Sequence, residues 1–181
     1  MKKVIVLFLF MSTFSYAQYA IKGTMSPIEN SSWVLLYKIE GTKQIFVKNT
    51  QVRKEGKTGF FEFSLPTDAK VGSYRIKYSM KRDGFMDFLF NKENIAFEFN
   101  PKDLENTIVF HESKENQIYI SFLKKIYTAQ YTLDSLQSEY FRNPSSLIKE
   151  AYIRSLGNFQ KIEKEYILAS EEKLVNHFIK A

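Results

Sequence analysis

The stretch GFFEFSLPTDAKVGSYRIKYS, residues 59–79, decides the fold. On both sides of its Pro66–Gly72 segment, apolar side chains alternate with polar ones, which is the pattern of strands with one buried face. The alternating apolar residues are Phe61, Phe63, Leu65, Tyr74, Ile76 and Tyr78. Two such runs around a Pro/Asp/Gly segment predict an antiparallel hairpin with one apolar and one solvated face.

The same alternation recurs before and after this stretch and predicts about eight strands in a β-domain over residues 18–112. The expected strands span residues 19–23, 33–40, 43–53, 59–65, 73–79, 85–90, 95–99 and 107–111. Strands so closely spaced favour an antiparallel β-sandwich or a partly open barrel. The 17 Phe and 11 Tyr residues of the chain suit the core of such a domain.

The pattern becomes helical over residues 113–181. Ser113 is the expected N-cap of a long helix. Its apolar residues repeat at spacings of three and four and form a heptad seam: Tyr119, Phe122, Ile126, Ala129, Leu133, Leu136 and Tyr140. Asn143 and Pro144 are predicted to end this helix and to start a second one, with Asn143 as its cap, over residues 147–166; Ser170 is predicted to start a third helical piece. The expected fold class is therefore α+β, a β-domain followed by a C-terminal helical hairpin.

The last residues leave three alternatives open. Leu174, Val175, Phe178 and Ile179 form an apolar face near the end of the chain, which the sequence predicts to be exposed. Such a face packs back on its own chain, forms a homodimer through the C-terminal helices, or continues in a longer protein. For the heptad seam itself, we favour packing against the second helix, because that helix carries a matching apolar stripe.

Residues 1–17 have the pattern of a signal peptide. Two lysines precede an apolar run of eight residues, and small residues at Ser15 and Ala17 predict cleavage between Ala17 and Gln18. The run is shorter than the roughly 20 residues of a membrane span. We expect an exported protein, periplasmic or in the cell envelope and soluble, with a mature chain of 164 residues (181 minus 17).

The net charge of +6 is unevenly distributed. Residues 18–82 contain twelve Lys or Arg and five Asp or Glu, a balance of +7, whereas residues 83–181 contain twelve and fifteen, a balance of −3. A basic half can bind phosphate or an anionic glycan. We favour a simpler interpretation, in which these side chains form the solvated faces of the strands. No nucleic-acid-binding motif is found, so nucleic acid is not an expected partner.

The sequence predicts no catalytic, cofactor-binding or metal-binding residues, and we do not expect an enzyme. There is no cysteine, and neither His111 nor His177 has a second ligand at helical spacing. No phosphate loop, nucleophile elbow or zinc-protease motif occurs. The carboxylate pairs Glu163/Glu165 and Glu171/Glu172 are expected on solvated helix faces rather than in acid–base roles.

The order of motifs resembles a known domain. The relevant segments are Ile21-Lys22-Gly23, Gly59–Phe63, Gly72–Ile76, Phe97-Glu98-Phe99 and Ser113–Phe122. Together they resemble the N-terminal β-domain, of unknown function, that precedes the thioredoxin-like domain in exported bacterial thiol–disulfide oxidoreductases of the TlpA/ResA type. The resemblance covers about residues 19–140. It transfers no catalytic residue, because redox chemistry in that family belongs to a downstream Cys-x-x-Cys domain.

Three functional hypotheses follow. The first is a non-catalytic envelope module that positions a partner, such as a thioredoxin-like protein or domain, or binds an extended ligand. The second is a truncated or separately encoded part of a thiol–disulfide oxidoreductase, as the resemblance implies. The third is a carrier of a small hydrophobic ligand, with Phe and Tyr lining a cavity between sheet and helices. Against the third, an ordinary aromatic core is the favoured role for these rings.

Overall fold

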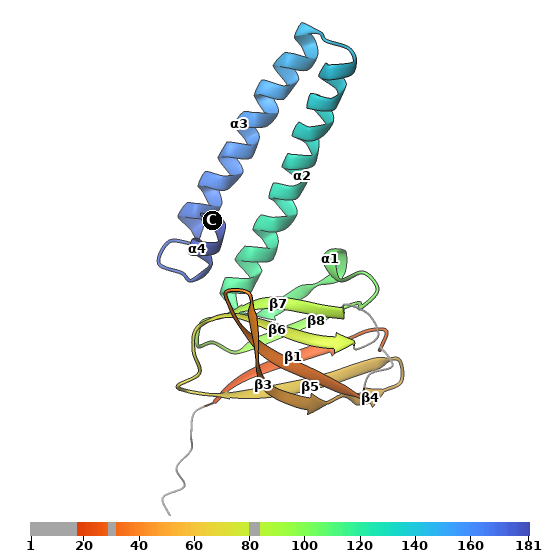
Figure 1. Cartoon of the computed structure of the whole chain (residues 1–181), viewed down its shortest axis with the longest axis vertical. Helices are drawn as coiled ribbons and strands as arrows, with labels where there is room; N and C mark the ends of the chain where they lie inside the picture. The colour runs from red at the N-terminus through yellow and green to blue at the C-terminus, as the bar shows by residue number, and fades with distance from the viewer. Residues whose placement is uncertain (1–17, 29–31, 80–83) are drawn as a thin grey trace, which may run out of the picture.

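Two β-sheets stack face to face, and two long helices stand on one end of the stack (Figure 1). This arrangement comes from a computed structural model, which describes residues 18–28, 32–79 and 84–181. The predicted signal peptide lies outside the described residues. The predicted fold class, a sandwich-like α+β fold with C-terminal helices, is confirmed, and the sheets do not close into a barrel.

The sheets contain five and four strands. The five-stranded sheet has the order β4 (Arg53–Glu55), β5 (Thr58–Pro66), β1 (Gln18–Met25), β8 (Ile95–Phe99) and β9 (Val109–Glu112). The four-stranded sheet has the order β3 (Lys43–Gln51), β2 (Trp33–Glu40), β6 (Gly72–Ser79) and β7 (Gly84–Phe90). All neighbouring strands are antiparallel except β1 and β8, which are parallel.

The predicted hairpin over residues 59–79 is wrong. β5 pairs with β1, where Phe63 lies opposite Ile21, whereas β6 pairs with β2, where Ile76 lies opposite Leu36. The alternation of buried residues along each strand was predicted correctly, but the two apolar faces meet across the sandwich rather than side by side. The five residues between the strands suffice for this, because sheets stack roughly 10 Å apart and an extended residue spans about 3.3 Å.

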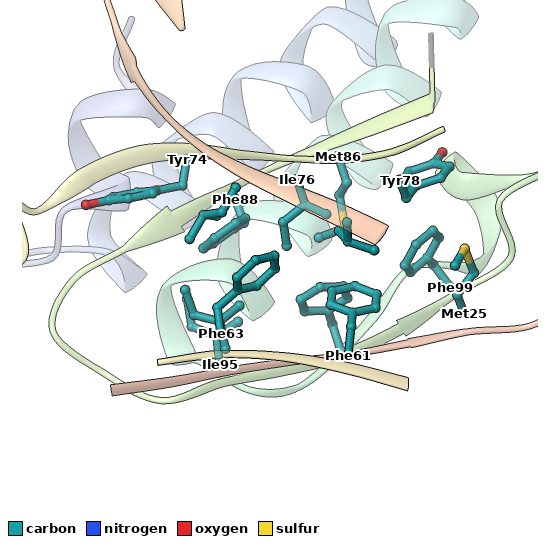
Figure 2. Packing of buried hydrophobic residues seen from close by; sticks show 14 of the residues in the cluster. Met25, Phe61, Phe63, Tyr74, Ile76, Tyr78, Met86, Phe88, Ile95 and Phe99 are labelled. Carbon is teal, nitrogen blue, oxygen red and sulfur yellow. The ribbon is translucent and has the colours of Figure 1, made fainter. Parts of the chain in front are cut away.

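Aromatic rings from the two sheets interlock in the core (Figure 2). Tyr78 of β6 and Phe99 of β8 have ring centroids 4.9 Å apart, and Phe63 and Phe97 are almost fully buried. Burial of each such side chain stabilises the fold by about 1.5–3 kcal/mol. These contacts hold the sheets together, and they include the alternating aromatic residues Phe61, Phe63, Tyr74 and Tyr78 from which the sandwich was predicted.

The described residues contain nine strands rather than eight. The predicted strand over residues 43–53 is divided into β3 and β4, which belong to different sheets. The break is at Val52, a buried residue whose N–H donates to the carbonyl of Ser32 at 2.9 Å. A short helix, α1 (Leu104–Thr107), also replaces part of a predicted loop, so that β9 begins at Val109 instead of Thr107.

The helical hairpin consists of α2 (Lys114–Arg142) and α3 (Ser146–Ala169), followed by the short α4 (Val175–Ile179). The predicted cap Ser113 is confirmed, since its hydroxyl accepts a hydrogen bond from the N–H of Asn116. The predicted start of the second helix is wrong. Asn143 ends α2, as predicted, but it does not cap α3. The hydroxyl of Ser145, one residue after Pro144, caps α3 by accepting from the N–H of Ile148 at 3.2 Å. A side-chain acceptor at that position satisfies an N–H that would otherwise have no partner.

The predicted exposure of the C-terminal apolar face is also wrong. Val175 is fully buried and Ile179 nearly so, in a cluster with Leu89, Phe122 and Ile126. Figure 1 shows α4 beside the lower part of α2. Of the three alternatives, the structure therefore shows the first, in which the end of the chain packs back on its own chain.

Replacement of Gly23 by Ala is expected to destabilise the sandwich by about 1–3 kcal/mol. A Cβ at this position would lie 2.1 Å from the ring of Phe61 on the neighbouring strand. The control is Gly157→Ala, at a helical position where a Cβ meets no atom within 4 Å, and this change should stabilise the protein by about 1 kcal/mol. Urea denaturation measures both, and an unchanged midpoint for Gly23→Ala would contradict the packing described here.

Candidate functional site

The first turn of α2 closes one end of the sandwich. The side-chain amide of Asn116 accepts from the N–H of Leu89 at 2.8 Å and donates to the carbonyl of the same residue at 2.7 Å. Leu89 belongs to β7, the last strand of its sheet. A neighbouring antiparallel strand would make the same two bonds, so the amide takes the place of a strand at that point. Asn116 is only 1% exposed, which strengthens both bonds.

The next residue holds the other sheet. Gln117 donates from its Nε2 to the carbonyls of Phe110 and His111 at 3.1 and 3.2 Å, and both belong to β9, the last strand of the five-stranded sheet. Consecutive side chains of α2 therefore bind the final strand of each sheet. This arrangement fixes the start of the helix between the two sheet edges.

A buried carboxylate ties the end of the chain to the same place. Glu115, 4% exposed, accepts hydrogen bonds from the side chain of Asn91 at 2.7 Å and from the backbone N–H groups of Leu174 and Val175 at 3.1 and 2.7 Å. Three donors compensate the loss of water around this group. Three polar side chains of the first turn of α2, those of Glu115, Asn116 and Gln117, thus help to assemble the fold.

Beyond this closed end lies an open groove of about 990 Å³. Its three walls are the edge of β7, the α1–β9 segment and one face of α2. The lining residues are Phe85, Met86, Asp87, Leu104, Glu105, Asn106, Ile108, Phe110, Ile120, Leu123, Lys124, Tyr127 and Thr128. We call this feature the junction groove, and it is the candidate functional site.

The backbone of β7 faces the junction groove with an unpaired edge. In an antiparallel strand, the N–H and C=O of alternate residues point to the same side. Because Leu89 bonds to Asn116, the corresponding groups of Asp87 and Phe85 also point away from β6. Within the described part of the chain, no strand pairs with this edge. The groove therefore offers two residues whose backbone donors and acceptors pair with no described strand.

A charged pair and a ring lie beside this edge. Arg75 of β6 binds both carboxylate oxygens of Asp87 at 2.6 Å, and its guanidinium lies 3.8 Å from the ring centroid of Phe85. The hydrogen bond to Asp87 raises the pKa of Arg75, so its guanidinium stays charged. Burial raises the pKa of the Tyr119 hydroxyl, with smaller contributions from Tyr127 and Asp87. The Tyr119 hydroxyl therefore remains neutral.

The α2 wall is a second apolar stripe, which the heptad analysis missed. It consists of Ile120, Leu123, Tyr127 and Tyr131, at spacings of three, four and four residues. Tyr127 and Tyr131 are 59% and 74% exposed. The spacing was visible in the sequence, but the seam toward α3 uses the same period and has more members, so it concealed this stripe.

The residues that the sequence analysis considered for chemistry do not come together. His111 lies on β9 with its Nε2 3.5 Å from a carboxylate oxygen of Glu98, and His177 lies in α4. Glu165 is exposed beside Lys161 on the surface of α3. No cluster of three potential metal ligands occurs among the described residues. In the same part of the chain, no helix has the length and apolar character needed to cross a membrane.

Comparisons with known proteins do not assign a family. No protein-family model matches the chain, and no curated protein has a significantly similar sequence. The resemblance to the β-domain of TlpA/ResA-type oxidoreductases therefore stays a prediction from the motifs.

Replacement of Asn116 by Leu is expected to destabilise the protein by about 2–4 kcal/mol. The change keeps the size of the side chain but leaves the N–H and C=O of Leu89 without partners, at about 1–3 kcal/mol for each buried group. Hydrogen exchange at the Leu89 amide should accelerate, and urea denaturation gives the loss of stability. Asn158→Leu, at an exposed position on α3, is the control and should change stability by less than about 0.5 kcal/mol. Equal effects of the two changes would contradict the proposed role of Asn116.

Proposed function

We propose that this protein is a non-catalytic, exported module of the cell envelope that binds a segment of a partner polypeptide in the junction groove. The observation that carries the proposal is the groove itself. One wall exposes the backbone and side chains of a sheet edge, and the opposite wall is an apolar stripe on a helix. Exposed apolar surface next to unpaired backbone is typical of sites that bind peptides.

A polypeptide fits the groove better than a small hydrophobic ligand does. Carriers of small ligands bury most of the ligand surface in an enclosed, apolar cavity. Here the groove is bordered by exposed side chains, such as Phe85, Asp87 and Tyr127, and the apolar stripe continues to Tyr131. The rings in the interior are occupied by contacts with one another, as for Phe61 with Phe97 at 5.9 Å.

The resemblance supports a thioredoxin-like protein or domain as a candidate partner. The groove is lined by residues between Phe85 and Thr128, all within the stretch that the resemblance covers. A partner held there would be positioned by the helical hairpin and by the sandwich together. In this proposal the chain contributes binding and orientation, and any redox chemistry belongs to the partner.

Phe85→Asp is expected to weaken peptide binding at least about tenfold, which corresponds to about 1.4 kcal/mol. The measurement is selection of peptides from a random display library on the purified chain, followed by titration of single peptides by fluorescence polarisation. The charge introduced at Phe85 removes an apolar contact and places a second carboxylate near Asp87. Ile153→Asp is the matched control, since Ile153 is an exposed apolar residue on α3 that does not line the groove.

Thermal unfolding of both variants shows whether they remain folded. Binding that both aspartate variants weaken equally, or that neither weakens, would show that the groove is not the site. Failure to select any peptide on the wild-type chain would count against a peptide-binding function.

A further inference from the structure

We propose that the partner segment binds as an added β-strand, paired through its backbone with β7 at Phe85 and Asp87. The segment is extended and short, with apolar side chains at alternate positions and an acidic side chain directed toward Lys124. This inference rests on the proposed function, because it specifies how the junction groove is occupied and by what chemistry.

The protein already contains one example of such pairing. The Asn116 amide binds the N–H and C=O of Leu89, as an adjacent strand would. The backbone N–H and C=O groups of Asp87 and Phe85 point in the same direction as those of Leu89, at two-residue intervals, and these two residues line the groove. An extended peptide is the ligand whose donors and acceptors match this spacing, because its own N–H and C=O groups repeat at the same interval.

Asn116 also sets the length and register of the added strand. Because its amide occupies the edge at Leu89, a partner strand pairs only with the residues before it and then turns away. Two edge residues, Phe85 and Asp87, provide up to four backbone hydrogen bonds. A segment of about four to six residues is enough to make them at about 3.3 Å per residue.

Alternate side chains of the added strand face different surroundings. On the side where Met86 enters the core, the groove presents Leu104, Ile108 and Phe110, all of which pack with the sandwich interior. On the other side lies the solvated face of the sheet, with the exposed Phe85 and the Arg75–Asp87 pair. Apolar residues at alternate positions of the peptide would therefore fill the inner side, as strand geometry requires.

The charged residues of the groove indicate which charge the partner segment carries. Arg75 neutralises Asp87 through two hydrogen bonds. Of the other charged residues that line the groove, Lys124 lies on the α2 wall and Glu105 on the α1 wall, and neither forms a salt bridge with a described residue. An acidic side chain is therefore complementary to the α2 wall and is repelled by the α1 wall.

The other sheet edges of the described chain are less suited to strand addition. Gln117 binds the carbonyls of β9, and β4 has only three residues. β3 carries Lys43 and Lys48 on either side of its exposed apolar residues 45–47, and the Nζ of Lys48 approaches the carbonyl of Ser64 at 3.5 Å. Lysines of this kind protect edges from pairing. The edge of β7 carries an aromatic residue and a neutralised acid at the positions that would pair.

The test is a backbone N-methylation scan of the tightest eight-residue peptide selected on the wild-type chain. N-methylation removes one donor and blocks pairing on that side of the strand. We expect methylation at alternate residues in the central part to weaken binding at least about tenfold. Methylation of the residues between them should change binding less than about threefold, because their N–H groups point away from β7.

A charge reversal tests the predicted acidic side chain of the partner segment. Lys124→Glu should weaken the same peptide by about tenfold or more, and replacing the acidic residue of the peptide by Lys should restore binding to that variant. Lys149→Glu, an exposed residue on α3, is the matched control and should leave binding unchanged. Absence of rescue would overturn the prediction that an acidic side chain of the peptide faces Lys124. Thermal unfolding shows whether the variants are folded.

The outcomes separate this inference from the proposed function. Peptide binding that depends on Phe85 but shows no alternation in the N-methylation scan would overturn strand addition and leave the groove as the binding site. Binding that does not depend on Phe85, or no binding at all, would overturn both.

Discussion

The pair of hydrogen bonds between the Asn116 amide and the backbone of Leu89 is the contact on which the arrangement of the two halves depends. It binds the first turn of α2 to the edge of one sheet, while Gln117 binds the edge of the other. A helix held by such bonds can stand on the end of a sandwich without covering a sheet face. The Asn116 amide and the Leu89 backbone are both buried. Loss of either partner therefore leaves an unsatisfied polar group, which makes the contact specific as well as stabilising.

The same contact explains why a groove exists beside a well-packed core. Six and ten residues after Asn116, α2 makes apolar contacts through Phe122 and Ile126 with the C-terminal segment, and Figure 1 shows the helix rising away from the sheets. Among the described residues, the strand edge before Leu89 is consequently left without a neighbouring strand. Fixing the helix at one point therefore closes the sheet locally and leaves the rest of the edge accessible. Pre-organised walls of this kind reduce the entropic cost of binding a flexible segment.

The C-terminal segment contributes to this rigidity. The Glu115 carboxylate accepts the N–H groups of Leu174 and Val175, and α4 then buries its apolar residues against α2. The base of the helical hairpin is thus fixed by a third element. Farther out, the two helices pack against each other, and residues such as Tyr131 and Phe141 are largely exposed. The molecule consequently combines a rigid junction with a hairpin that projects into solvent.

The sequence by itself determined the local structure: the alternation in residues 59–79, the seam from Phe122 to Leu133 and the Ser113 cap all depend on neighbours close in the chain. It did not determine which strands pair, because alternating faces are equally well buried beside each other or across a sandwich, and the structure places β5 and β6 in different sheets. The burial of the C-terminal face and the junction groove were likewise decided only by tertiary structure. Both depend on hydrogen bonds between residues 27 to 60 positions apart, and no periodicity in the sequence encodes such long-range pairs.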